Sequence, residues 1–270
     1  MRRNFADVLK NAKIDISYEY TTLFDMVYYG VKYIPTKSYK EIVDEYFYKI
    51  PFRGTCTSLE SFDYVNNFYF PNSPNNFNID FLINFCEYWY NMARALNGNI
   101  SNVSYNNYSY FIIDHIRKVI DKIGYKELYY DGFYVFVEND KAAVAVSEII
   151  ENNDYDVLYY NHHSLKGDLE GKKILLLKFA NYLEPRRNEL KQINPKLETQ
   201  IFQLFNKMNM SHNNNDPSTK NFVPYIATMK KNEIENWYDE IYQMFLLSML
   251  ELEHLKRKPK LDELLENINK

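Results

Sequence analysis

The chain contains only seven glycines among its 270 residues. Rossmann domains, TIM barrels and β-propellers depend on glycine at tight turns and at close backbone contacts, so this scarcity argues against all three architectures. Hydrophobic residues make up 46% of the chain, which is sufficient for a packed core in one large or two modest domains. The periodicity of those hydrophobic residues then decides the fold class.

Apolar residues recur at helical spacing through most of the chain, which predicts a mainly α protein. We expect helices over residues 18–29, 38–49, 79–96, 106–123, 141–151, 163–183, 186–210 with one interruption at Pro195, 233–256 and 261–268. Ser38 can cap the second of these helices, and Glu41 three residues later completes a capping-box signature.

One β element interrupts the helices. Asp131-Gly132 lies between aromatic and β-branched residues, and this pattern predicts a hairpin near residues 127–137. Residues 162–270 carry 17 basic and 15 acidic residues, whereas the rest of the chain carries 15 and 21. We therefore expect a helical N-terminal domain over residues 1–160, which includes the hairpin, and an antiparallel helical bundle over residues 161–270.

The aromatic content is high, with 26 Tyr, 18 Phe and 2 Trp. A surface on which bases stack is one explanation. Codon bias in an AT-rich genome is the explanation we favour, because the aromatic residues are spread along the whole chain at spacings that favour a core.

Charge and cysteine usage limit the function classes. The net charge of −4 excludes a globally basic nucleic-acid binder but not a local basic site. Cys56 and Cys86 form no CxxC pair, which fits a reducing compartment and no structural zinc. The N-terminus lacks a signal-peptide core, and the most apolar run, residues 244–252, is too short to span a bilayer. We expect a soluble cytoplasmic protein without a membrane partner.

Two short motifs point weakly to ligands. Residues 167–173, GDLEGKK, resemble a phosphate loop but are one residue short, lack a Ser or Thr after the lysine and contain two carboxylates. His162 and His163 would point about 100° apart on a helix, and no other His or Cys stands at ligand spacing. We therefore expect neither a metal nor a cofactor.

Two basic clusters allow a structural or a functional explanation. The run Lys256-Arg257-Lys258-Pro259-Lys260 follows a predicted helix, where cations favour the helix dipole, but it could also hold phosphates. Arg186 and Arg187 lie near a helix start, where positive charge is unfavourable, and this favours an anion or RNA contact.

The segment of residues 204–214, LFNKMNMSHNN, is the most informative one. His212 stands where an apolar helix meets an Asn-rich loop, six residues after Asn206. Ordinary loop capping is one explanation, because Asn suits helix ends.

The same segment resembles the HEPN superfamily, whose signature is an Arg, often followed by a polar residue, and a His four to six residues later. Asn206, followed by Lys207, stands in the Arg position, and His212 stands in the His position. The order of DFLINFCEYWYNM, the hairpin, the SEII helix and YYNHHSLKGDLEGKKILL, within residues 79–250, is similar to that of AbiJ-like abortive-infection proteins.

The resemblance implies a phage-defence protein that forms a homodimer and cleaves RNA without a metal. His212 would move the proton at the 2′-oxygen or the leaving oxygen, and Asn206 and Lys207 would contact the phosphate. Arg186, Arg187 and Lys220 would bind RNA.

Asn206 also motivates a different function, because a neutral carboxamide cannot replace a guanidinium at a pentavalent phosphate. The alternative is a non-catalytic HEPN-like module that binds RNA, a nucleotide or a protein partner. A structural helical dimer without any nucleic-acid role is a third possibility.

Overall fold

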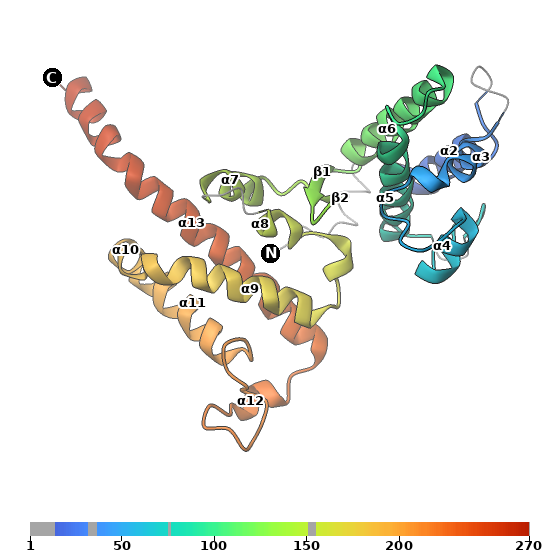
Figure 1. Ribbon diagram of the computed structural model, residues 1–270. Coiled ribbons are helices and arrows are strands. Elements are labelled where there is room, and N and C mark those ends of the chain that lie inside the picture. The colour runs from blue at the N-terminus through green and yellow to red at the C-terminus, as the bar shows by residue number, and fades with distance from the viewer. Residues whose placement is uncertain (1–13, 32–36, 75–76, 151–154, 270) are drawn as a thin grey trace. The chain divides into compact units, whose positions relative to one another are not determined.

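The computed structural model of the chain describes residues 14–31, 37–74, 77–150 and 155–269. The protein is mainly helical, with one two-stranded antiparallel sheet and a C-terminal helical bundle, which confirms the predicted fold class (Figure 1). The chain forms two compact units, Met1–Glu138 and Asn139–Lys270. Among the described helices, none combines the length and the apolar character needed to cross a membrane.

All the described helices of the first unit precede the hairpin. Its elements are α2 (Ile16–Tyr28), α3 (Tyr39–Glu45), the 3-10 helix η1 (Phe47–Lys49), α4 (Leu59–Asn66), α5 (Ile79–Leu96), α6 (Val103–Lys122), β1 (Tyr125–Tyr130) and β2 (Phe133–Glu138). The capping box at Ser38 and Glu41 is confirmed, because each residue's side chain accepts a hydrogen bond from the backbone N–H of the other. Helix α5 packs against α6, α2 and β2 and forms the centre of this unit.

Aromatic side chains form much of the core of the first unit. Phe85 of α5 lies 4.9 Å from the Tyr20 ring and 5.1 Å from the Phe70 ring. The buried tyrosines satisfy their hydroxyls, as Tyr39 does with the Ser109 hydroxyl at 2.9 Å. Aromatic pairs of this geometry add to the burial energy, so packing accounts for much of the aromatic content here.

The hairpin forms at the predicted place. Tyr130 pairs with Phe133, and Asp131 and Gly132 between them both have positive φ, 48° and 88°, as a two-residue type I′ turn requires. Polar side chains of α5 bond to the backbone of β2. Glu87 accepts a hydrogen bond from Phe136 N at 2.7 Å, and Asn91 both donates to and accepts from the Tyr134 backbone.

The second unit is all-helical within its described residues. Its elements are α7 (Lys141–Ile149), α8 (Asp156–Tyr159), the 3-10 helices η2 (His163–Leu165) and η3 (Glu184–Arg186), α9 (Leu169–Leu183), α10 (Arg187–Ile193), α11 (Pro195–Lys207), α12 (Pro224–Ala227) and α13 (Lys231–Ile268). Helix α13 packs against α7, α9, α10 and α11. It is therefore the central helix of the bundle.

The boundary between the two units lies earlier than residue 160. Residues 139–160 belong to the second unit because α7 and α8 pack against its helices. The Tyr242 hydroxyl of α13 donates to Val157 O at 2.8 Å, and Lys178 of α9 donates to Asp156 at 2.5 Å. Polar contacts of this kind leave no signal in the charge distribution along the chain.

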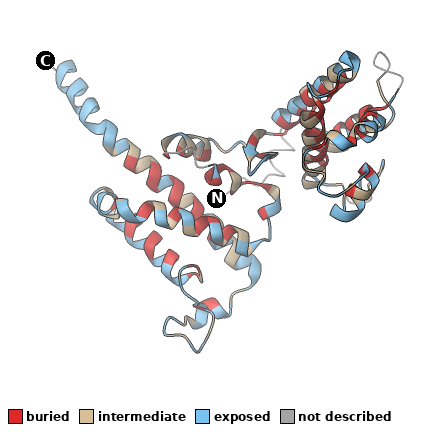
Figure 2. Cartoon of the chain, in the orientation of Figure 1, coloured by how far each residue is buried: buried red, intermediate tan, exposed pale blue. Residues whose placement is uncertain are grey.

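The expectation of two separate C-terminal helices is wrong. Helix α13 is a single helix that continues through Pro259. Its last fully buried residue is Leu252, and residues 256–269 are all exposed (Figure 2). A proline inside a helix removes one backbone hydrogen bond, and on an exposed segment water can solvate the carbonyl that loses it.

Candidate functional site

An asparagine network shapes the loop between α11 and α12. Asn209 N donates to Asn214 Oδ1 at 3.0 Å, and Asn214 N donates to Asn209 Oδ1 at 3.1 Å. Asn214 Nδ2 donates to Asn221 O at 2.7 Å, and Val223 N donates to Asn214 O at 2.9 Å. The buried Asn214 therefore joins the start of the loop to its end. We call Asn209, Asn214, Asn221 and Val223 the asparagine clamp.

The three candidate catalytic residues lie beside this clamp. Asn206 and Lys207 occupy the last turn of α11, and His212 lies in the turn between Asn209 and Asn214. All three side chains are exposed. Among the described residues His212 makes no hydrogen bond or ion pair, so no side chain of the described part orients its ring. A general base needs such an orienting partner or a bound substrate in its place.

Four lysines lie in or beside the segment that links α11 to α13. Lys207 precedes the clamp, Lys220 lies next to Asn221, and Lys230 and Lys231 follow α12 at the start of α13. All four are exposed, and none of them forms an ion pair with a described residue. Asp216 is the one carboxylate between residues 206 and 231, and Ser218 satisfies it through its N–H and its hydroxyl.

Helix α13 holds this segment against the bundle. The Tyr238 hydroxyl donates to Met208 O at 3.2 Å, and Lys231 lies two turns earlier on the same helix, about 10 Å along its axis. Tyr225 of α12 is 71% exposed and adds an aromatic ring. We call Asn206, Lys207, His212, Lys220, Tyr225, Lys230 and Lys231 the basic loop surface.

The predicted RNA-binding arginines lie elsewhere in the bundle. Arg187 Nε donates to Glu198 at 2.6 Å, and Glu198 stands in the first turn of α11. Lys207 ends the same helix nine residues later, about 13 Å further along the axis. The structure therefore brings Lys207, His212 and Lys220 together around one loop and leaves Arg186 and Arg187 at the other end of α11.

Both arginines already have partners. The Arg187 guanidinium lies 4.3 Å from the Phe202 ring centre and 3.6 Å from the Glu184 carboxylate, in addition to its bond with Glu198. Arg186 lies 4.4 Å over the Tyr182 ring. The carboxylates offset the unfavourable positive charge at the start of α10, so this position needs no bound anion.

The segment of residues 167–173 begins a helix rather than binding a phosphate. Asp168 caps α9 by accepting a hydrogen bond from Gly171 N at 3.0 Å. Lys172 is buried, and its ammonium lies 2.7 Å from Glu235 and 2.9 Å from Asp239 of α13. The lysine that resembles a phosphate ligand therefore joins α9 to α13.

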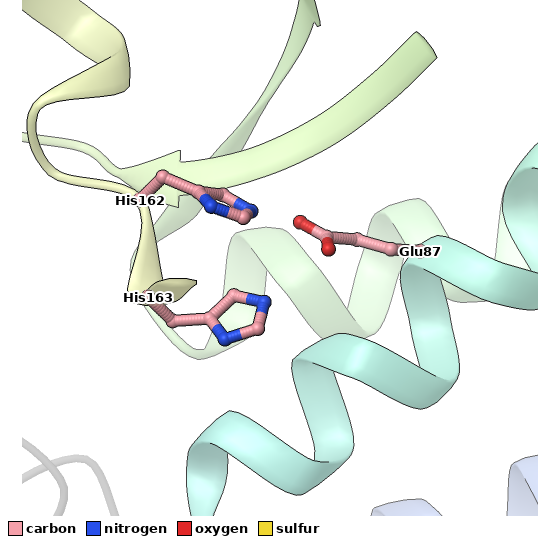
Figure 3. A group of neighbouring side chains, drawn as sticks. All are labelled: Glu87, His162 and His163. Atoms are coloured by element: carbon pink, nitrogen blue, oxygen red, sulfur yellow. The ribbon is translucent and has the colours of Figure 1, made fainter. Parts of the chain in front are cut away.

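His162 and His163 do not point apart as adjacent residues on an α-helix would. His162 has extended backbone and caps the 3-10 helix η2, and the two ring centres are 4.4 Å apart (Figure 3). His162 Nδ1 lies 2.7 Å from the Ser164 hydroxyl and accepts from Ser164 N, and its ring stacks on Tyr159.

Tyr225, Lys230 and Lys231 are the members of the basic loop surface that we did not predict. The available signal was the charge of residues 199–232, which contain four lysines and one carboxylate. Because the overall charge of the bundle is nearly balanced, a charge sum over the whole bundle does not reveal this local excess of positive charge.

The comparisons with known proteins give no family for this chain. No family model, no curated protein and no solved structure matches it.

Proposed function

We propose that the chain is a phage-defence protein whose second unit binds RNA through the basic loop surface, without cleaving it. The observation that carries the proposal is the set of four exposed lysines, without ion-pair partners among the described residues, in the segment that links α11 to α13 and contains one hydrogen-bonded loop. Phosphate oxygens are the partners that such lysines lack. The resemblance to abortive-infection proteins supplies the biological setting.

Single-stranded RNA suits this surface better than a double-stranded nucleic acid does. Single-stranded RNA exposes bases that stack on aromatic rings and form hydrogen bonds along their edges. Tyr225 offers a ring, while the carboxamides of Asn206 and Asn213 offer donors and acceptors from exposed positions. The basic loop surface, together with the neighbouring Asn213, thus offers charge, an aromatic ring and hydrogen-bonding groups in one segment.

Two features favour binding over cleavage. Asn206 leaves the Arg position of the HEPN signature without a charge, and Arg187 is engaged by Glu198 and Glu184 and cannot supply one. A lost charge-assisted contact to a developing oxyanion costs roughly 10²–10³ in rate. In the dimer that the resemblance implies, this loss would occur in both copies.

The first experiment measures RNA binding and RNA cleavage with the full chain. Fluorescence anisotropy with a labelled single-stranded RNA should show binding, and gel analysis of the same RNA after long incubation should show it intact. RNA cleavage that His212→Ala abolishes would establish the ribonuclease instead. No binding of RNA at low salt would refute the proposal.

A matched control tests the location. Replacing Lys207, Lys220 and Lys231 by Ala should weaken binding strongly. Replacing Lys37, Lys40 and Lys118 of the first unit by Ala should not, because each of these lysines is already paired with a carboxylate. A nucleotide such as ATP is the second probe, and displacement of RNA by ATP at low concentration would favour a nucleotide-binding module.

A further inference from the structure

Two arginines of the first unit share one carboxylate. Arg117 Nε of α6 donates to Glu127 Oε2 of β1 at 2.9 Å, and Arg94 Nη2 of α5 lies 3.6 Å from Glu127 Oε1. The Tyr90 hydroxyl of α5 donates to the same carboxylate at 2.5 Å. Helix α5 packs against α6 and β2, and α6 packs against β1, so these elements together fix the positions of both arginines.

The two arginines keep a positive charge that Glu127 does not neutralise. Burial alone would raise the pKa of Glu127, but hydrogen bonds from Arg117 and Tyr90 lower it below its usual 4.5, so the carboxylate is ionised at neutral pH. Among the described residues it is the one carboxylate within ion-pair distance of either arginine. Asp114, one turn before Arg117 on α6, is paired with Lys118. Two guanidiniums and one carboxylate therefore leave an excess of one positive charge, which attracts an anion.

Arg94 also has hydrogen-bond donors to spare. Its Nη2 donates to the Tyr134 hydroxyl at 2.9 Å, whereas its Nε is buried and has no hydrogen-bond partner in the described part of the chain. The side chains of Arg94 and Arg117 are 31% and 46% exposed, so solvent reaches both guanidiniums. A guanidinium presents its N–H groups in a planar fork that fits the oxygens of a phosphate. The arginine pair thus offers both the charge and the donors that bind a phosphate group.

An exposed aromatic ring lies beside the arginine pair. The Arg94 guanidinium is 4.4 Å from the Tyr134 ring centre, and the Tyr129 ring centre is 4.9 Å from that of Tyr134. The Tyr129 ring is therefore at most about 9 Å from the Arg94 guanidinium. Tyr129 is 56% exposed, and it lies on the same face of the hairpin as Glu127, two residues earlier on β1. A base attached to a bound phosphate can stack on such a ring.

We propose that Arg94, Arg117 and Tyr129 form a binding site for a free mononucleotide. The phosphate contacts the two guanidiniums, and the base stacks on the Tyr129 ring. The excess of one positive charge suits a single phosphate group better than the repeating charges of an RNA strand. The site lies in the first unit, so it does not depend on RNA binding by the basic loop surface of the second unit.

Isothermal titration calorimetry of the full chain with AMP tests the ligand class. We expect AMP to bind, and we expect ribose 5-phosphate and inorganic phosphate to bind about tenfold more weakly, because neither has a base that stacks. Tyr129→Ala should lower the affinity for AMP to that for ribose 5-phosphate. No binding of AMP, or equal affinities for AMP and ribose 5-phosphate, would overturn the proposal.

Substitutions of charged residues test the phosphate contact. Arg117→Gln should weaken AMP binding about tenfold, because it removes a charge-assisted hydrogen bond. Lys118→Gln, a change on the same helix at a lysine that already pairs with Asp114, should leave AMP binding unchanged. Glu127→Gln should strengthen AMP binding, because it removes the negative charge that competes with the phosphate. If Arg117→Gln binds AMP like the wild type, or if Glu127→Gln binds it more weakly, the arginines serve only the fold and the proposal is wrong.

A comparison with the basic loop surface tests the location. Replacing Lys207, Lys220 and Lys231 by Ala should leave AMP binding unchanged, and Arg117→Gln should leave RNA binding unchanged. The two sites can therefore fail separately. Loss of AMP binding in the triple lysine variant would assign the nucleotide to the second unit and overturn the proposal.

Discussion

Asn209 and Asn214 exchange hydrogen bonds across the turn that carries His212. Each backbone N–H donates to the side-chain oxygen of the other residue, at 3.0 and 3.1 Å. Asn209 has φ of 58°, a left-handed conformation that Asn tolerates better than most residues. The Asn-rich composition of this segment thus has a structural role, which is to hold an exposed loop in one shape.

Asn214→Ala should loosen that loop and weaken RNA binding. The substitution removes the hydrogen bonds to Asn209 N and Asn221 O, which are partly buried, and each such bond contributes about 0.5–1.5 kcal/mol to the free energy of unfolding. Urea unfolding measures the cost, and hydrogen exchange of residues 208–223 measures the local opening. Faster exchange confined to another region would contradict the role of the clamp.

The Asn209→Gly variant separates backbone from side-chain effects. Glycine keeps the positive φ but removes the oxygen that accepts from Asn214 N. We expect a smaller loss of stability than for Asn214→Ala, because Asn209 makes fewer of the bonds. Equal losses would contradict this expectation, because they would mean that the one bond accepted by Asn209 contributes as much as the two side-chain bonds of Asn214.

Lys172→Met should destabilise the second unit strongly. It removes the cation between Glu235 and Asp239 and leaves two carboxylates near each other in a poorly solvated place. Breaking a buried ion pair in this way costs about 3–5 kcal/mol. Urea unfolding should therefore show a lower midpoint than for Lys173→Met, a neighbouring control. An unchanged midpoint would mean that the pair contributes little.

The pairing of Arg187 with Glu198 predicts a stability that depends on pH. The hydrogen bond from Arg187 is the main cause that lowers the pKa of Glu198 below its usual 4.5, against the opposite effect of burial. A carboxyl whose pKa is lower in the folded state stabilises the protein above the unfolded pKa, and this contribution is lost as the pH falls through the folded value.

Glu198→Gln tests that dependence. The variant should lose less stability than the wild type between pH 6 and pH 3, two values that bracket the usual pKa of about 4.5. Thermal unfolding across that range measures the difference, and Glu189→Gln, an exposed control on α10, should behave like the wild type. Parallel curves for Glu198→Gln and the wild type would show that the pair does not titrate in this range.

Pro259→Ala should stabilise the distal part of α13. A proline in a helix interior costs about 3 kcal/mol relative to alanine, and an exposed position keeps nearly all of that difference. Slower hydrogen exchange of residues 253–269 is the expected result. If the exchange rates stay unchanged, Pro259 does not destabilise this part of the helix.

Much of the fold could be predicted from local patterns. Asp131-Gly132 specifies the hairpin because both residues accept positive φ, and Ser38 with Glu41 specifies a helix start through bonds within one turn. The prediction of two helices separated near Pro259 was wrong because local propensity favours a break at proline. Packing stabilises α13 as far as Leu252, and the helix continues from there.

The candidate site could be predicted only in part. The position of Lys207, His212 and Lys220 on one loop follows from their order in the chain. The ion pair of Arg187 with Glu198 and those of Lys172 with Glu235 and Asp239 join residues 11, 63 and 67 positions apart, so the sequence around either cation gives no sign of these partners. In the sequence, a cation with an ion-pair partner cannot be distinguished from a cation without one.

The salt dependence of RNA binding tests the central claim most directly. For single-stranded RNA, each lysine that contacts a phosphate contributes about 0.7 to the slope of log K against log salt concentration. Replacing Lys207, Lys220 and Lys231 by Ala should lower the magnitude of that slope by about 2, and replacing Lys37, Lys40 and Lys118 should leave it unchanged. A slope that both triple variants leave equal to that of the wild type would contradict RNA binding by the basic loop surface.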